Sequence, residues 1–128
     1  MFRKAKIIIL SLLSLTLNSC LNEYEKEVIG KYDLREYKLK DPLEKTSINP
    51  ILSVNKNKTF ILEFKNKVIS GTWEANDNGD WTYIEFTYGN DKIEGRIGTD
   101  EIHINSPYNF GIENVESLDF KRFYEDLK

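Results

Sequence analysis

Cysteine and histidine, the two residue types that most often bind metals or act as nucleophile and base, each occur once in this chain, as Cys20 and His103. A zinc site with nitrogen and sulfur ligands needs three or four such residues, so the composition excludes one. A single cysteine also excludes an intramolecular disulfide. His103 lies between Ile102 and Ile104, and strand alternation places it on the outward face. Without a Gly-x-Ser-x-Gly turn to supply a nucleophile, we expect a surface histidine rather than part of a catalytic triad.

Carboxylates are the other candidates for chemistry, since the chain has 21 Asp and Glu residues. Glu74 and Glu85 flank an expected hairpin. A glycosidase needs its carboxylate pair in a cleft. We expect both side chains on the solvated outer face instead. Asp77, Asn78 and Asp80 superficially match a calcium loop, yet the twelfth-position Glu and the flanking helices of an EF-hand are missing. We interpret these three as turn residues. The sequence predicts no enzyme, no cofactor and no metal site.

The first twenty residues have the three parts of an export signal, followed by a cysteine. These parts are a basic segment (3–6), an uncharged run (7–17) and the tetrapeptide Leu17-Asn18-Ser19-Cys20. The uncharged run is about eleven residues long, too short for a membrane span of roughly 20, and it fits the apolar core of a secretory signal. The tetrapeptide resembles the bacterial lipobox through Leu17, Ser19 and Cys20. That resemblance implies cleavage after residue 19 and acylation of Cys20, for example with palmitate; the alternative is an ordinary signal peptide with Cys20 as a bystander.

Removing residues 1–19 changes the charge balance of the chain. Three basic residues and no acidic ones leave, so the formal net charge falls from −3 to −6. A charge of this sign argues against nucleic acid and anionic membrane surfaces as partners. We therefore expect membrane attachment through the lipid on Cys20. Leu21 follows the cysteine in place of Asp, and by resemblance to Gram-negative sorting rules this favours the outer membrane, more on the periplasmic face than exposed at the cell surface.

Beyond Cys20 we expect a lipidated tether over residues 20–27 and one β-domain over residues 28–128. The acidic stretch Asn22–Glu27 is typical of a solvated linker, with at most one helical turn. From Val28 onward, β-branched and aromatic residues alternate with polar ones between clusters of turn residues. The alternation slips near Arg35-Glu36, which indicates a β-bulge. The expected strands are 29–39, 51–54, 59–65, 68–75, 81–88, 92–97, 101–105 and 115–123, with longer loops at 41–49 and 106–114.

Eight strands joined by short turns form antiparallel neighbours, and no helical stretch is long enough to cover a sheet face. Such a sheet can bury its apolar face by closing on itself. The sequence therefore predicts an all-β, antiparallel, up-and-down eight-stranded barrel, with a two-sheet β-sandwich of the same strand order as the alternative. The side chains expected inside are large, so we expect a mostly filled interior. They are Tyr32, Phe60, Leu62, Phe64, Trp73, Ile84, Phe86, Ile93, Ile102, Ile104, Leu118 and Phe120.

Three segments resemble the lipocalin-like small bacterial lipoproteins. Gly30-Lys31-Tyr32 is similar to the Gly-x-Trp segment that opens lipocalins, with Tyr in place of Trp. Residues 52–62 look like an aliphatic, turn, Thr-Phe hairpin, and residues 70–74 like the Gly-x-Trp strand that follows it. The similarity in layout covers roughly residues 29–122. It implies a lipocalin-like barrel with a binding function, although the chain is shorter than secreted lipocalins and has no clear helix before the final strand.

Aromatic residues gather in the second half of the chain. They are Trp73, Trp81, Tyr83, Phe86, Tyr88, Tyr108 and Phe110. Trp81 and Tyr83 share the face opposite Ile84 and Phe86, so one set belongs to the core and the other lies outside. The outer set stabilises the sheet by cross-strand pairing or forms a binding surface for a protein or glycan. We expect a non-enzymatic, membrane-anchored envelope lipoprotein that binds an envelope protein or a small apolar ligand; the alternative is an assembly accessory of an outer-membrane complex without a ligand.

Overall fold

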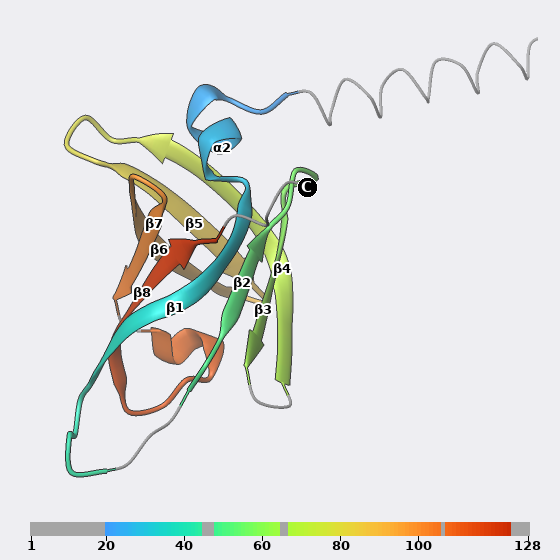
Figure 1. Ribbon diagram of the computed structural model, residues 1–128. Coiled ribbons are helices and arrows are strands. Elements are labelled where there is room, and N and C mark those ends of the chain that lie inside the picture. The colour runs from blue at the N-terminus through green and yellow to red at the C-terminus, as the bar shows by residue number, and fades with distance from the viewer. Residues whose placement is uncertain (1–19, 45–47, 65–66, 106, 124–128) are drawn as a thin grey trace, which may run out of the picture.

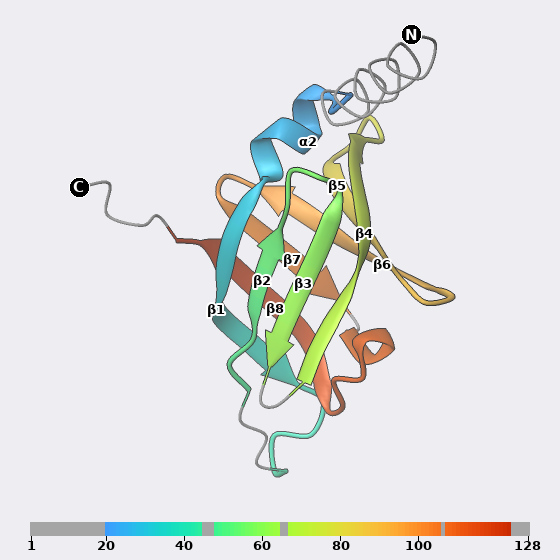
Figure 2. The same cartoon turned by 90° about the vertical axis from the view of Figure 1, so that its right-hand side faces the viewer.

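The computed structural model describes residues 20–44, 48–64, 67–105 and 107–123. In this part of the chain, eight strands form a closed barrel in which each strand pairs antiparallel with the next and the last returns to the first (Figures 1 and 2). The predicted all-β up-and-down barrel is confirmed, and the sandwich alternative is wrong. The elements are α2 (Glu23–Val28), β1 (Gly30–Leu39), β2 (Ile51–Val54), β3 (Thr59–Phe64), β4 (Lys67–Asp77), β5 (Thr82–Tyr88), β6 (Asp91–Gly98), β7 (Glu101–Asn105), the 3-10 helix η1 (Pro107–Phe110) and β8 (Val115–Arg122).

Several sequence predictions fall on residues that are not described. The export signal over 1–19 lies outside the described residues, as do parts of the predicted loop at 41–49 and of the turn at 66–67. The charged tail after residue 123 and the side chain of Tyr108 also lie outside them. Within the described ranges, no helix is long and apolar enough to cross a membrane.

The strands lie close to their expected positions, and the predicted bulge is present. The register between β1 and β8 shifts between Leu34 and Glu36, where the alternation of the sequence slips, and again between Lys38 and Leu39. A bulge bends its strand and increases the local twist. Here it lies in the strand pair that closes the barrel.

Large apolar side chains fill the inside of the barrel. The twelve residues expected inside are all buried. Phe60, Phe86 and Phe110 contact one another edge to face, with ring centroids 4.9 to 5.8 Å apart. Leu34 is half-buried and packs against this core from the bulged part of β1. The interior is therefore a packed core rather than a deep ligand cup.

Short helical segments cover the two ends of the barrel, and they are the main difference from the sequence prediction. α2 lies over one end, and η1 lies at the opposite end (Figure 1). The stretch Asn22–Glu27 is not a solvated linker, because Leu21, Glu25 and Val28 are buried. The predicted loop at 106–114 contains η1, which carries the fully buried Phe110 into the core.

Candidate functional site

Trp81 and Tyr83, the two residues predicted to form a surface patch, lie outside the barrel core and are half-buried. Tyr83 pairs across the sheet with Arg96 on β6. The guanidinium carbon of Arg96 lies 3.9 Å from the centroid of the Trp81 ring, which is a cation–π contact. We call Trp81, Tyr83 and Arg96 the aromatic patch. The indole N–H of Trp81 is buried and has no hydrogen-bond acceptor among the described residues.

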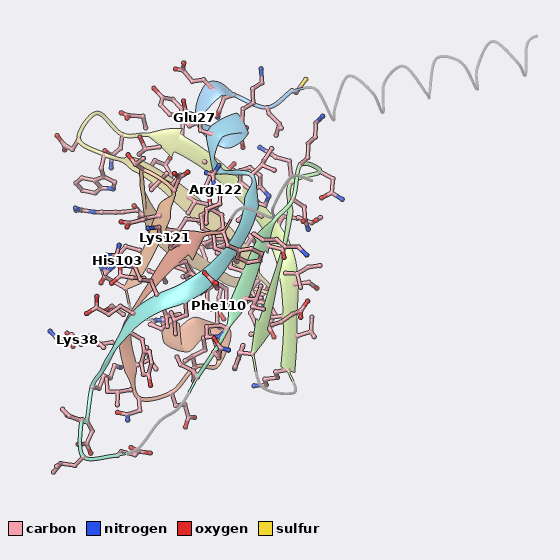
Figure 3. All side chains as sticks on the ribbon, in the orientation of Figure 1. Glu27, Lys38, His103, Phe110, Lys121 and Arg122 are labelled. Carbon is pink, nitrogen blue, oxygen red and sulfur yellow. The ribbon has the colours of Figure 1, made fainter. Side chains whose placement is uncertain are left out.

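His103 occupies the outer face, as predicted (Figure 3). It pairs across the sheet with Arg96, so it lies in the same cross-strand row as Tyr83 and Arg96 of the aromatic patch. Its Nδ1 contacts the carboxylate of Asp119 on β8, and its Nε2 lies 2.9 Å from Oδ1 of Asn105. The hydrogen bond to Asp119 raises the pKa of His103, and it outweighs the partial burial that would lower it. Neither partner is a hydroxyl or thiol, so the described contacts orient the ring in a surface ion pair without a nucleophile.

The carboxylates singled out in the sequence also lie on the outer face. Glu74 pairs directly with Glu85, and Glu85 pairs in turn with Glu94. Lys92 lies 3.4 Å from Glu85 and offsets part of this negative charge. The predicted turn beyond Ala75 is stabilised by Asx contacts from residues 77 and 78 to the backbone of residues 79–81. In the described ranges, no group of three or more His, Cys, Asp or Glu residues is placed to hold a metal ion.

A buried carboxylate fastens α2 to the barrel, and sequence reasoning missed it. Glu25 is only 2% exposed and forms an ion pair with Lys58, the last residue of the β2–β3 turn. It also accepts a hydrogen bond from the backbone N–H of Ala75 on β4 at 3.3 Å. At the N-terminus of α2, Asn22 and Glu25 form a reciprocal capping box, and Nδ2 of Asn22 donates to the carbonyl of Ala75 at 2.8 Å. The Asn22-x-x-Glu25 spacing was the available sequence signal. We call Asn22, Glu25, Lys58 and Ala75 the Glu25 network.

The Glu25 network holds the carboxylate in its charged form. Burial by itself raises the pKa of Glu25, but the hydrogen bonds from Lys58, Asn22 and Ala75 outweigh it, so the pKa lies below its ordinary value of 4.5. A carboxyl whose pKa is lower in the folded state than in the unfolded state stabilises the fold at pH values above its unfolded-state pKa. This contribution is lost as the pH falls through the folded pKa.

Replacing Glu25 with Gln should therefore lower the free energy of unfolding at neutral pH by about 2 kcal/mol, because hydrogen bonds to a charged group are lost at a buried position. In the wild type, protonation of this carboxyl should lower the free energy of unfolding below about pH 4.5. The variant should lack this decrease. Urea unfolding at pH 7 and at acid pH measures both effects. Glu27→Gln removes an exposed charge from the same helix and is the matched control. Equal stabilities of the two variants at neutral pH would show that the network does not fasten α2.

A second set of contacts joins α2 to the closing strand of the barrel. Arg122, at the end of β8, donates to the backbone carbonyl of Glu27 and, at 2.9 Å, to the hydroxyl of Tyr32 on β1. The Tyr32 hydroxyl donates to the carbonyl of Val28 at 2.7 Å. Figure 3 shows Arg122 directly beneath Glu27 at this end of the barrel. Tyr32 and Arg122 are far apart in sequence, so no local pattern could predict this contact.

A surface pocket of about 560 Å³ lies beside these contacts, between α2, the start of β5 and the β6–β7 hairpin. Its charged lining residues are of both signs: Lys26 and Arg122 are cationic, and Glu27 and Asp100 are anionic. Arg122 and Asp100 form an ion pair at 3.7 Å. The remaining lining residues are Tyr24, Thr82, Ile97, Gly98 and Thr99. The pocket suits a small ligand or headgroup that carries balanced charges.

Cys20 is exposed and unpaired and precedes α2. Every strand of the barrel follows it in the sequence. The described part of the chain is thus a filled, eight-stranded antiparallel barrel, compatible with a lipocalin-like fold, with an exposed thiol at its start. Comparisons with protein-family models, with curated proteins and with solved structures find no match for this chain.

Proposed function

We propose that this chain is a lipid-anchored protein of a bacterial cell envelope, related to the lipocalin-like lipoproteins, and that its barrel is a non-enzymatic binding module. The observation that carries the proposal is the position of Cys20. It closes a lipobox-like tetrapeptide after an uncharged apolar run, and it is exposed immediately before the folded domain. Acylation at this thiol would leave the described barrel intact. We place the anchor in the outer membrane, with the domain on the periplasmic face.

The packed interior favours a partner on the outside of the barrel over an apolar ligand within it. Phe60, Phe86 and Phe110 occupy the space that a lipocalin-like ligand would need. The aromatic patch is the best candidate surface, because Trp, Tyr and Arg are enriched at protein interfaces. The unsatisfied indole N–H of Trp81 adds to this, since a partner that supplied an acceptor would relieve the cost of a buried donor. An envelope protein is therefore the proposed partner.

Replacing Cys20 with Ser should abolish incorporation of labelled palmitate and release the protein from the membrane fraction, because serine provides no thiol for acylation. Metabolic labelling followed by fractionation measures both. Ser19→Ala keeps a small residue before the cysteine and should label as the wild type does. Unchanged labelling of the Cys20→Ser variant would refute the anchor.

Replacing Trp81 with Ala should weaken capture of an envelope protein from detergent-solubilised envelopes at least tenfold, since a central aromatic interface residue commonly contributes more than about 1.4 kcal/mol. Quantitative affinity capture with the purified lipoprotein measures the loss. Val68→Ala is the control, because it truncates an exposed apolar side chain that lies on the outer face but does not belong to the aromatic patch. If a folded Trp81→Ala variant captures the same proteins as the wild type, the aromatic patch is not the binding surface.

A further inference from the structure

We propose that the α2 end of the barrel lies directly on the membrane surface, with zwitterionic lipid headgroups as the chemistry that it contacts. This inference rests on the proposed acylation of Cys20. It adds the orientation of the domain and the surface that faces the lipid, neither of which follows from acylation alone.

The first support is that the chain between the anchor and the barrel is very short. Leu21 is only 9% exposed, and Asn22 is fixed by its capping box and by its 2.8 Å hydrogen bond to Ala75. A fully extended chain spans at most about 3.6 Å per residue, so at most roughly 7 Å separates Cys20 from Asn22, which is hydrogen-bonded to the barrel. A long tether would let the domain tumble, but this short one holds its α2 end at the anchor.

The second support is that α2 is itself held rigidly against the barrel. The Glu25 network joins it to the β2–β3 turn and to β4. On the other side of the helix, Arg122 binds the carbonyl of Glu27 and the hydroxyl of Tyr32. A lipid attached before α2 therefore orients the whole barrel and not only the helix.

The third support is the charge of the pocket beside α2. Its lining has Lys26 and Arg122 against Glu27 and Asp100, and the exposed Glu23 adds negative charge on α2 outside the pocket. The balanced pocket fits zwitterionic headgroups, whereas an anionic membrane surface would attract a domain with excess basic charge. Tyr24, half-buried on α2, and Lys26 supply the amphipathic side chains that are common at a membrane–water interface.

This orientation has a consequence for the partner. Trp81 directly precedes Thr82, and Thr82 pairs with Asp77 at the end of β4 nearest α2. The aromatic patch therefore begins at the α2 end of the barrel. A protein that binds it must itself lie at the membrane surface.

Fluorescence quenching in reconstituted vesicles tests the orientation. Because the acylated Cys20 cannot react, a cysteine introduced at Thr99 or at Asn90 is the sole thiol available for a fluorophore. Both positions are exposed turn residues, at opposite ends of β6. Eight residues of strand separate the two ends, by about 26 Å. In phosphatidylcholine vesicles with headgroup-labelled quencher lipid, the fluorophore at Thr99 should be quenched several-fold more than the one at Asn90.

A linker variant supplies the matched control. Ten Gly/Ser residues inserted between Cys20 and Leu21 give a flexible reach of about 18 Å, so the difference between the two positions should largely disappear. Equal quenching at the two positions without the linker would overturn the orientation while leaving the anchor in place. Purified protein whose mass shows no acyl group would instead refute the proposed function itself, so the two failures are distinguishable.

Discussion

Replacing Phe110 with Ala should lower the free energy of unfolding by about 4 kcal/mol. Phe110 is 1% exposed, and its ring lies 5.8 Å from those of Phe60 and Phe86, measured between centroids. Truncation removes the apolar surface that the ring buries and leaves a cavity between the two remaining rings. Substitutions of this kind cost about 3–5 kcal/mol in packed cores. The 3-10 helix η1 is short, so it has few other residues that could move into the cavity.

Chemical denaturation at neutral pH measures this loss, with Leu43→Ala as the control. Leu43 is 93% exposed, and its truncation should change the stability by no more than about 0.5 kcal/mol. A loss below about 1 kcal/mol for Phe110→Ala would mean that η1 does not close this end of the core. The same variant also tests the packed interior, because the cavity should admit a small apolar probe that the wild type excludes.

Replacing Gly71 with Ala should destabilise the barrel by about 3 kcal/mol, a large effect for one added methyl group. A Cβ at this position would lie 2.0 Å from the carbonyl oxygen of Thr87 on β5 and 2.8 Å from Cε1 of Phe60 on β3. The first of these atoms belongs to the backbone, so relief requires the strands to move apart. Overpacking of this kind typically costs about 1–3 kcal/mol and occasionally more.

Gly98→Ala is the matched control for Gly71→Ala. Gly98 lies at the end of β6, and the nearest atom to a Cβ built there is 3.8 Å away, which is ordinary van der Waals contact. Thermal unfolding of the two variants should therefore show a large fall in Tm for Gly71→Ala and almost none for Gly98→Ala. Similar Tm values would show that the strands at Gly71 can separate without cost.

The sequence predicted the barrel well because its strands are amphipathic and its turns are short. Phe60, Leu62 and Phe64 recur on a period of two, and the expected range of this strand differs from β3 by one residue. The bulge near Arg35-Glu36 was visible for the same reason, since one extra residue breaks the alternation. His103 and the Glu74–Glu85 pair were placed on the outer face by this rule alone.

The two end-covering segments were missed because their burial depends on contacts distant in sequence. Glu25 looks like a solvated charge until Lys58 and the backbone of Ala75 are brought to it by the β2–β3 turn and β4. Phe110 follows a proline in a loop, and only the closed barrel provides the hydrophobic space for its ring. The candidate patch was predicted in part: Trp81 and Tyr83 were named, but Arg96 joins them only through the register of β5 and β6.

The central claim is that Cys20 is the lipid-bearing N-terminus of the mature protein, and intact-mass spectrometry tests it most directly. The protein is extracted from membranes with detergent and measured without digestion. We predict the mass of residues 20–128 plus a diacylglyceryl group, with or without a third acyl chain, and a single modified N-terminal peptide that contains Cys20. A mass that retains residues 1–19, or an N-terminus at Cys20 without an acyl group, would contradict it.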